Sequence, residues 1–499
     1  MSDYDVIVIG AGCGGLSAGA LLARQGRKVL VLEQSERVGG CCSTFERDGY
    51  SFDLGATILE MTPILDKLFQ KLGSSLDKEL SLVSCDPVYS LITHDGSRFS
   101  YPVSSEGTAR VIAGIDPEDG KSWTRYSRDF EEFVNYLVDD FLTKPANTIF
   151  DMMRSLRKLP HPFKYAPFFM GSYQDVIFKY FKNQTIRESM SFQSFYAGNP
   201  PELCGGHFSL LPYSEHQGVY YPKGGMIELP RAIQRCGERL GMETRLNTRV
   251  KKIMVHKKKT TGVVLADGTE ISSDIVVSNI NAKTLYLNMI GEEKLPRIVR
   301  RGIKSYDLSL SHPMIYLGVN YRPPIEAHHA LITRPTSEIN DYWWNKYKQG
   351  IFPDEQFGIV CCPTLSDPSL APEGHHILLL TLAPGPYELR GSDWDTEKQG
   401  IMERVIDYYS KNFIPGLAEH VEVAAFSTPV DFERRLLSPG GAIYALAQDM
   451  PQTTCFRPAA KSKCLDGLYL TGASTHPGGG VATVIASGLI AADLIEKYE

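Results

Sequence analysis

The sequence predicts a mixed α/β protein that contains a Rossmann-type dinucleotide-binding domain. Two observations lead to this fold class: a complete β-α-β pattern occupies the N-terminus, and several later runs read as strands of one antiparallel sheet. A third is the aromatic-rich stretch 121–185, which reads as helices. The chain of 499 residues is too long for one compact core and predicts two or three folding units.

The first element is a short run of β-branched residues, 5–9, which predicts a buried parallel strand. Residues 16–25 predict a helix that ends at Gly26, and residues 28–33 predict a second strand. Strand, helix and strand follow one another as in a β-α-β unit. The glycine motif between the first strand and the helix therefore stands in the context that dinucleotide binding requires.

This motif reads Gly10-Ala-Gly12-Cys-Gly-Gly15. Gly10 allows the tight turn, Gly12 lets the backbone approach a pyrophosphate, and Gly15 lets the helix pack closely on the strand. The helix N-terminus offers free N–H groups to the phosphates. Glu33 ends the second strand, where an acid accepts hydrogen bonds from ribose hydroxyls. The motif by itself does not choose between NAD and FAD.

The segments after Glu33 resemble a known flavoprotein superfamily. Arg37-Val-Gly39-Gly40 follows the acid, and residues 50–57 read Tyr-Ser-Phe-Asp-Leu-Gly-Ala-Thr. The combination resembles the amine-oxidase and phytoene-desaturase superfamily, and residues 50–57 resemble phytoene desaturases in particular. The resemblance implies that FAD is the cofactor and that Gly39 and Gly40 bring a second backbone segment against it.

A segment in the middle of the chain resembles the same family. Residues 218–226 read Gly-Val-Tyr-Tyr-Pro-Lys-Gly-Gly-Met and precede a predicted helix, 227–240. Residues 244–254 then predict one strand, and residues 274–279 predict another. The resemblance implies that the chain returns here to the FAD domain, with the backbone of Val250 near the adenine.

The C-terminal segment 467–480 also resembles the phytoene-desaturase form, and a predicted helix, 481–497, follows it. Three glycines before a helix let a planar ring lie on the backbone. The positive end of the helix would then stabilise the anion of reduced flavin. The residues expected at the cofactor here are Gly472, Thr475, His476, Gly479, Gly480 and Val481.

The resemblance covers essentially the whole chain and implies a discontinuous FAD-binding domain. Its parts would be residues 1–85, 216–283 and 441–499. The remaining stretches, 86–215 and 284–440, would form the substrate-binding region, with a helical lid over about 121–185. Four runs predict one antiparallel sheet in this region: residues 309–321, 357–362, 377–383 and 421–426.

The resemblance implies an FAD-dependent oxidoreductase, similar to phytoene desaturases, that acts on carbon–carbon bonds of a long isoprenoid or polyene such as a carotenoid. One hydrogen would leave toward the flavin as a hydride. A polyene reductase or saturase and a flavin-dependent cis–trans isomerase carry the same motifs and stay open as alternatives. Because the sequence has a single dinucleotide motif, the electrons are expected to pass to an external acceptor such as oxygen or a quinone.

A non-catalytic alternative also exists. Rab escort proteins and GDP-dissociation inhibitors resemble this fold and bind prenyl chains without catalysis. The glycine-rich segment 472–480 favours the flavoenzyme, because an escort protein has no need of it.

No firm catalytic acid or base stands out. Glu215 and His216 precede the segment that begins at Gly218 and could accept a substrate proton, although a surface turn is the better explanation of them. The ten cysteines include no C-x-x-C pair, so no metal site is expected. The net charge of −6 disfavours nucleic acid as a partner.

The N-terminus has no secretory signal, and no apolar stretch approaches the roughly 20 residues that span a bilayer. The protein is therefore expected in the cytoplasm, either free or peripheral on a membrane. Peripheral contact is expected around residues 150–183, where bases and apolar side chains mix. The alternative is that these apolar residues form a lid over the substrate cavity. The apolar side chains are Phe150, Met152, Met153, Phe163, Tyr165, Phe168, Phe169, Met170 and Phe178.

Overall fold

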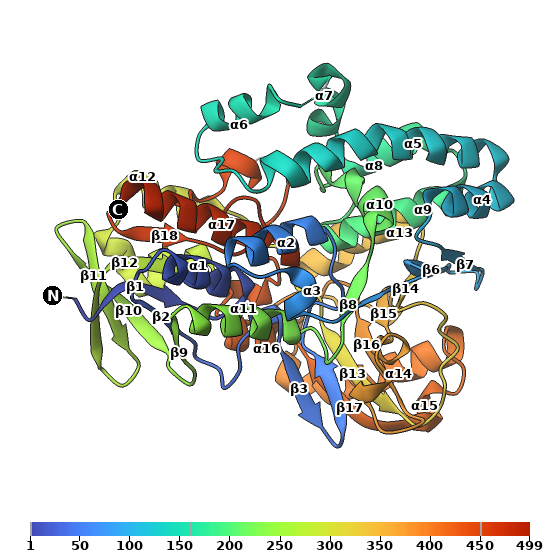
Figure 1. Ribbon diagram of the computed structural model, residues 1–499. Helices are drawn as coiled ribbons and strands as arrows, with labels where there is room; N and C mark the ends of the chain where they lie inside the picture. The colour runs from blue at the N-terminus through green and yellow to red at the C-terminus, as the bar shows by residue number, and fades with distance from the viewer. Residues whose placement is uncertain (1, 160, 450–451) are drawn as a thin grey trace.

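A computed structural model describes residues 2–159, 161–449 and 452–499, and it confirms the predicted α/β class (Figure 1). The first sheet has the order β10-β11-β12-β1-β2-β9, and β18 pairs with β12. Its strands are β1 (Tyr4–Ile9), β2 (Val29–Leu32), β9 (Glu243–Arg245), β10 (Val250–His256), β11 (Lys259–Leu265), β12 (Glu270–Ser278) and β18 (Leu468–Leu470). The pairs β12–β1, β1–β2, β2–β9 and β12–β18 are parallel.

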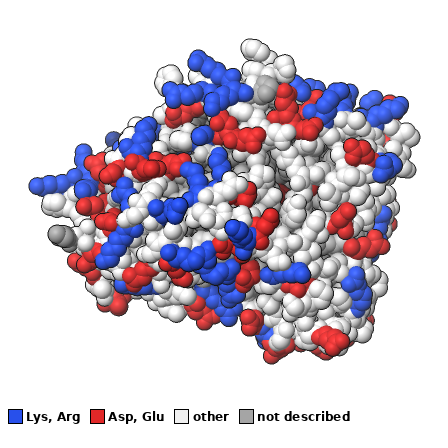
Figure 2. Space-filling model, viewed as in Figure 1, with Lys and Arg blue, Asp and Glu red and all other residues white. Residues whose placement is uncertain are grey.

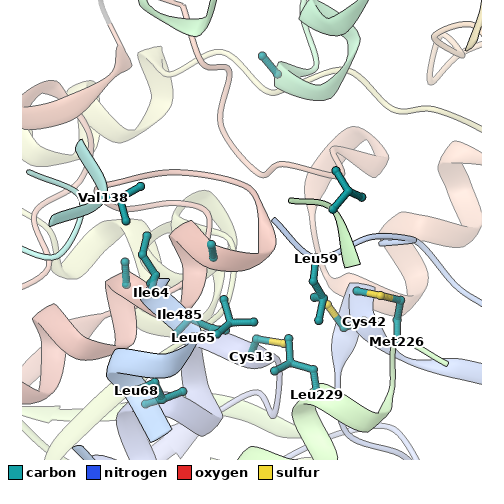
Figure 3. Close-up of a cluster of buried hydrophobic side chains, with 14 of the residues drawn as sticks. Cys13, Cys42, Leu59, Ile64, Leu65, Leu68, Val138, Met226, Leu229 and Ile485 are labelled. Carbon is teal, nitrogen blue, oxygen red and sulfur yellow. The ribbon is translucent and has the colours of Figure 1, made fainter. Parts of the chain in front are cut away.

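Both faces of the central strand β1 are buried, which explains its continuous run of β-branched residues. Val6 and Val8 belong to the hydrophobic core on one face, whereas Ile7 and Ile9 belong to the core on the other. The first face is covered by α1 (Cys13–Arg24), α11 (Glu228–Arg239) and α17 (Val481–Tyr498). Figure 3 shows side chains of α1, α11, α17 and α2 (Thr62–Lys71) converging on this core.

The predicted strand over residues 244–254 is wrong in one respect, because two strands occupy it. β9 pairs with β2 and β10 pairs with β11, so the two strands lie at opposite edges of the sheet. Between them Asn247 has a φ of 51°, a left-handed conformation that ends an extended strand. The sequence did not indicate this turn, because Asn247 adopts the left-handed conformation with no glycine or proline beside it.

The second sheet has the order β17-β13-β16-β15-β14-β6-β7, and it contains the four predicted strand runs. Its pairs are antiparallel except β14 with β6. The strands are β6 (Tyr89–Ile92), β7 (Arg98–Tyr101), β13 (Met314–Val319), β14 (His329–Ile332), β15 (Gly358–Cys361), β16 (His376–Thr381) and β17 (Val421–Ser427). Two short pairs complete the strands: β3 (Thr44–Arg47) with β4 (Tyr50–Asp53), and β5 (Leu82–Ser84) with β8 (Tyr220–Pro222).

Helices form a layer above the two sheets, at the top of Figure 1. They include α4 (Ser105–Ile115), α5 (Pro117–Tyr136), the π-helical turn η2 (Leu137–Phe141), α6 (Ile149–Leu156), α7 (Pro162–Met170), α8 (Tyr173–Tyr180), α9 (Gln184–Phe192) and α10 (Leu211–Ser214). The other α-helices are α3 (Leu76–Glu79), α12 (Arg297–Ser305), α13 (Thr336–Asp341), α14 (Trp394–Asn412), α15 (Leu417–His420) and α16 (Pro429–Leu436).

Aromatic side chains hold α7 against α5. Phe168 stacks on Phe130 with ring centroids 4.8 Å apart, and Tyr165 stacks on Phe133 at 5.1 Å. Phe168 and Tyr165 are therefore buried, and they do not face outward as expected for a membrane contact. This packing could not be predicted from the sequence, because α7 has apolar residues around most of its circumference. The side chains of Phe169 and Met170 lie outside the described residues.

Candidate active site

One cavity of about 620 Å³ connects the N-terminal glycine motif with the helical layer. At one end it is lined by Glu33 and Val250, and at the other by Phe133 and Phe141 of the helical layer. Eleven of the residues expected to bind FAD line it: Gly10, Gly12, Glu33, Gly39, Gly40, Val250, Gly472, His476, Gly479, Gly480 and Val481. The chain thus brings three distant segments together around a single space.

The glycine motif has the conformation that its sequence indicates. Gly10 has a φ of 94°, which favours glycine, and Gly12 is the N-cap of α1 without a side-chain cap. A Cβ on Gly15 would lie only 2.1 Å from the carbonyl oxygen of Gly10. Gly15 does not line the cavity, and its role is the close packing of α1 on the strand turn.

Asn279, which follows β12, is the residue on which the glycine segments converge. A Cβ on Gly12 would lie 2.6 Å from its Nδ2 atom, and one on Gly14 would lie 3.0 Å from its Oδ1 atom. Gly472 is similarly close, because a Cβ there would lie 2.3 Å from Oδ1. The absence of side chains on these glycines therefore lets the three segments pack closely around Asn279, which also lines the cavity. Asn279 was predicted only as the end of the strand 274–279, because its contacts are with glycines far away in the sequence.

Backbone hydrogen bonds orient the carboxylate of Glu33. Its Oε2 accepts from the N–H of Ala11 at 2.8 Å and its Oε1 from the N–H of Ser35 at 2.9 Å. Each oxygen keeps a lone pair, so the carboxylate can also accept from ribose hydroxyls. Its contact with FAD stays a prediction.

The second glycine pair lies directly beside the first motif. The N–H of Gly39 donates to the carbonyl of Ala11 at 2.8 Å, and Gly39 and Gly12 form a parallel bridge. Gly39 and Gly40 have φ values of 113° and 58°. Both backbone segments therefore reach the same stretch of the cavity wall.

Arg435 of α16 offers a positive charge that the sequence motifs did not indicate. It lines the cavity, and its Nη2 donates to the carbonyl of Leu54 at 3.2 Å. Its Nε is buried without a hydrogen-bond partner among the described residues. A buried, unpaired donor on a cationic side chain fits an anionic or carbonyl-bearing ligand such as FAD.

The C-terminal segment ends at the start of α17, whose N-cap is Gly480. His476 lines the cavity, and its Nε2 lies 3.3 Å from the carbonyl oxygen of Phe141. Burial lowers the pKa of His476 to about 4, so the ring is neutral at neutral pH. Thr475 does not line the cavity, because its hydroxyl donates to the carbonyl of Pro458 at 2.7 Å.

Glu215 and His216 lie behind the cavity wall. Glu215 is buried and accepts a short hydrogen bond from Gln193, and His216 Nδ1 lies 2.9 Å from the carbonyl oxygen of Val103. Burial, reinforced by the charge of Glu60, raises the pKa of Glu215 well above its ordinary value. Neither residue lines the cavity, and a catalytic role for either stays a prediction.

Glu60 is the acid that the sequence motifs did not single out. It lines the cavity five residues after Gly55 and is half-buried. Its carboxylate makes no hydrogen bond or ion pair within the described part of the chain, and burial raises its pKa to about 7. The other acids in the lining are Glu33, which follows β2, and Glu36.

His329 lines the cavity, and its neighbour His328 is buried outside the lining. His329 Nε2 lies 2.8 Å from the hydroxyl of Thr57, and His328 Nδ1 lies 2.8 Å from that of Ser366. With Cys361 they form the one cluster of potential metal ligands in the described residues. Since hydrogen bonds already engage both rings, we interpret the cluster as a buried polar network of which only His329 reaches the cavity.

The chain matches the model of the family described as flavin containing amine oxidoreductase over residues 13–496. It is 31% identical to a phytoene desaturase of Fusarium fujikuroi, with 100% of this chain and 90% of the relative covered. It is 30% identical to the neurosporene-forming phytoene desaturase of Rhodobacter capsulatus, with 98% and 93% covered.

Solved structures share the fold at low identity. An oxidoreductase from Methanosarcina mazei has a TM-score of 0.67 and 16% identity, with 98% of this chain and 99% of that chain covered. Wild-type putrescine oxidase has a TM-score of 0.62 and 16% identity, with 99% of each chain covered.

Proposed function

This chain belongs to the family of flavin containing amine oxidoreductases, and we propose that it is an FAD-dependent desaturase of a long isoprenoid or polyene. The observation that carries the proposal is the single cavity, in which the nucleotide motifs continue into a wall of apolar side chains such as Phe133, Leu137 and Phe141. An apolar wall in the same cavity as the glycine segment 472–480 suits a hydrocarbon chain. The curated relatives named phytoene desaturases support this substrate class.

Desaturation removes a hydride and a proton from neighbouring carbons and leaves a double bond between them. Bound FAD supplies the two-electron acceptor for the hydride. An external oxidant such as oxygen or a quinone must then receive the electrons, since the chain carries one dinucleotide motif. The protein's own tasks are to orient the polyene in the cavity and to accept the proton.

Glu60 is better placed than Glu215 or His216 to accept this proton. It faces the cavity, and the titratable groups whose charges reach it are Glu215, Tyr196 and Tyr444. Because burial sets its pKa at about 7, a substantial fraction is ionised at neutral pH and can act as a base. Glu60 is therefore our candidate for the catalytic base.

The function is tested with FAD-loaded protein and phytoene or diapophytoene in liposomes without oxygen. A desaturase bleaches the flavin as the polyene absorption moves to longer wavelength. An isomerase changes the polyene without net flavin reduction, and a reductase acts only on reduced enzyme and shortens the chromophore. A protein that binds FAD and polyene but gives none of these changes would contradict an enzymatic role on this substrate class.

The Glu60 assignment has its own test in the same assay. The rate of flavin reduction in the wild type should rise with pH through about 7, because the carboxylate is the active form. Glu60→Gln should slow this step by roughly 10²–10⁴-fold and remove the pH dependence. Glu36→Gln, which changes another acid of the lining, is the control. An unchanged rate in Glu60→Gln with normal FAD content would exclude Glu60 as the base.

We also propose that the helical layer docks on an anionic membrane. Phe163 of α7 is 92% exposed and Phe150 of α6 is 78% exposed. Figure 2 shows basic side chains along the same upper edge of the molecule; those of α6, α7 and their connection are Arg154, Arg157, Lys158 and Lys164. Within residues 2–159, 161–449 and 452–499, no helix combines the length and apolar character needed to cross a bilayer.

The docking surface continues beyond the 150–183 region. α6 contacts the turn η14 (Thr454–Phe456), and the carbonyl of Phe456 accepts from Tyr306, which follows α12. Ile298 of α12 is 81% exposed. The bases of α12 are Arg297, Arg300, Arg301 and Lys304. Exposed apolar side chains surrounded by bases are what an interfacial surface presents to anionic headgroups.

Flotation with vesicles that contain phosphatidylserine tests the docking surface. The wild type should float at low salt and less so at high salt. Phe150→Ser combined with Phe163→Ser should reduce flotation, whereas Tyr387→Ser, which changes an exposed aromatic elsewhere, should not. Equal flotation of the two variants would refute this surface and leave the FAD-dependent function untouched.

A further inference from the structure

Arg457 is a buried cation directly behind the C-terminal glycine segment. Its guanidinium is 4% exposed and donates only to backbone carbonyls. Nη1 donates to Ala447 at 3.1 Å and to Gln452 at 3.0 Å, and Nη2 donates to Leu446 at 3.3 Å and to Ala473 at 2.6 Å. Within the described residues no carboxylate pairs with it.

Two contacts place this charge next to the cofactor segment. Ala473, which receives the 2.6 Å hydrogen bond, lines the cavity. A Cβ on Gly478 would lie 3.7 Å from the Cζ atom of Arg457. The charge also reaches the lining residue His476, because it adds to the lowering of that ring's pKa by burial. Its field therefore extends into the cavity near the start of α17.

A cation without a carboxylate partner is expensive to bury. Burial lowers the pKa of Arg457 to about 10, so the side chain nevertheless stays charged at neutral pH. The groups whose charges offset this are Asp449 and Tyr306. No neutral side chain carries enough N–H donors to bind four carbonyls, so the guanidinium and its charge are retained together. That charge lies beside the cavity lining, where it can also act on a bound cofactor.

We propose that Arg457 is a positioning residue that raises the reduction potential of the bound FAD. Uptake of a hydride adds one negative charge to the ring system. The guanidinium behind the C-terminal glycine segment and the N-terminal end of α17 would both present positive potential to that charge. The reduced form is thereby stabilised relative to the oxidised form. The inference requires bound FAD but does not depend on which substrate the enzyme oxidises.

Spectroelectrochemical titration of the FAD-loaded protein measures the potential directly. Arg457→Gln keeps amide donors but removes the charge, and it should shift the midpoint to a more negative value. A tenfold loss in the relative affinity for reduced over oxidised FAD would appear as a shift of about 30 mV. Arg457→Lys, which keeps the charge, should stay near the wild type. Lys463→Gln removes an exposed cation nearby and is the control.

Asp449→Asn provides a second variant in case Arg457→Gln does not fold. It removes the acid whose charge opposes that of Arg457, so the midpoint should move to a more positive value. Equal shifts in Arg457→Gln and Arg457→Lys would mean that the hydrogen bonds matter and the charge does not. An unchanged midpoint in Arg457→Gln, or in Asp449→Asn if Arg457→Gln does not fold, would overturn the inference, whatever the polyene assay shows.

Discussion

Asp53, at the end of β4, provides a sharp test of how the cofactor segments are held together. Its side chain is 1% exposed. Oδ2 accepts from the hydroxyl of Tyr221 at 2.6 Å, and Oδ1 accepts from the N–H of Met226 at 2.8 Å. The carboxylate thus links residues 50–57 to residues 218–226, the two segments that resemble phytoene desaturases. Burial raises its pKa to about 7, although both hydrogen bonds oppose the shift.

The sign of the pH effect follows from this shift. The folded state holds the proton up to pH of about 7, whereas the unfolded state releases it near the ordinary value of 3.8. The group therefore contributes stability that is complete below the unfolded pKa and is lost as the pH rises through the folded pKa. The difference of about 3 units amounts to about 4 kcal/mol at 1.36 kcal/mol per unit. Roughly 2 kcal/mol of this falls between pH 5.5 and pH 8.

Asp53→Asn removes the titration and keeps the shape of the side chain. The free energy of unfolding of the variant apoprotein, minus that of the wild type, should be about 2 kcal/mol larger at pH 8 than at pH 5.5. For a chain of this size the corresponding difference in Tm is about 2 °C. Thermal unfolding of both apoproteins at the two pH values measures the difference in Tm without stabilisation by FAD. Asp48→Asn, in the exposed turn of the same hairpin, is the control. A difference in Tm between Asp53→Asn and the wild type that is equal at both pH values would refute this account of Asp53.

Three further substitutions test the cofactor segments. Gly12→Val should give a folded protein without flavin colour, because its Cβ would lie 2.6 Å from Asn279 Nδ2 and fill the approach of the pyrophosphate; a yellow variant would contradict this. Glu33→Ala should weaken FAD binding, measured by dialysis, whereas Glu36→Ala should not, and equal retention by both would exclude the ribose contact. Gly15→Ala should lower Tm even in apoprotein, because its Cβ would lie 2.1 Å from a backbone oxygen; an unchanged Tm would show that the turn can relax.

Local features of the sequence predicted the nucleotide-binding part of the fold. The run 5–9, the glycine motif and Glu33 all act within about thirty residues, so their spacing alone indicates a β-α-β unit. The strand runs of the second sheet were also visible, because alternation and β-branched residues are properties of short segments. The single strand predicted over 244–254 failed at Asn247, where one left-handed residue redirects the chain.

The sequence by itself determined the family and the cofactor class, because short motifs of glycine and acid specify them. Only the tertiary structure decided which polar groups face the cavity. Glu60 and Arg457 are chemically ordinary in the sequence, and their shifted pKa values come from burial in the folded chain. Phe168 likewise appeared suited to a membrane until α7 packed it on Phe130. Desolvation and long-range packing set these roles, and neither quantity is encoded in the local pattern.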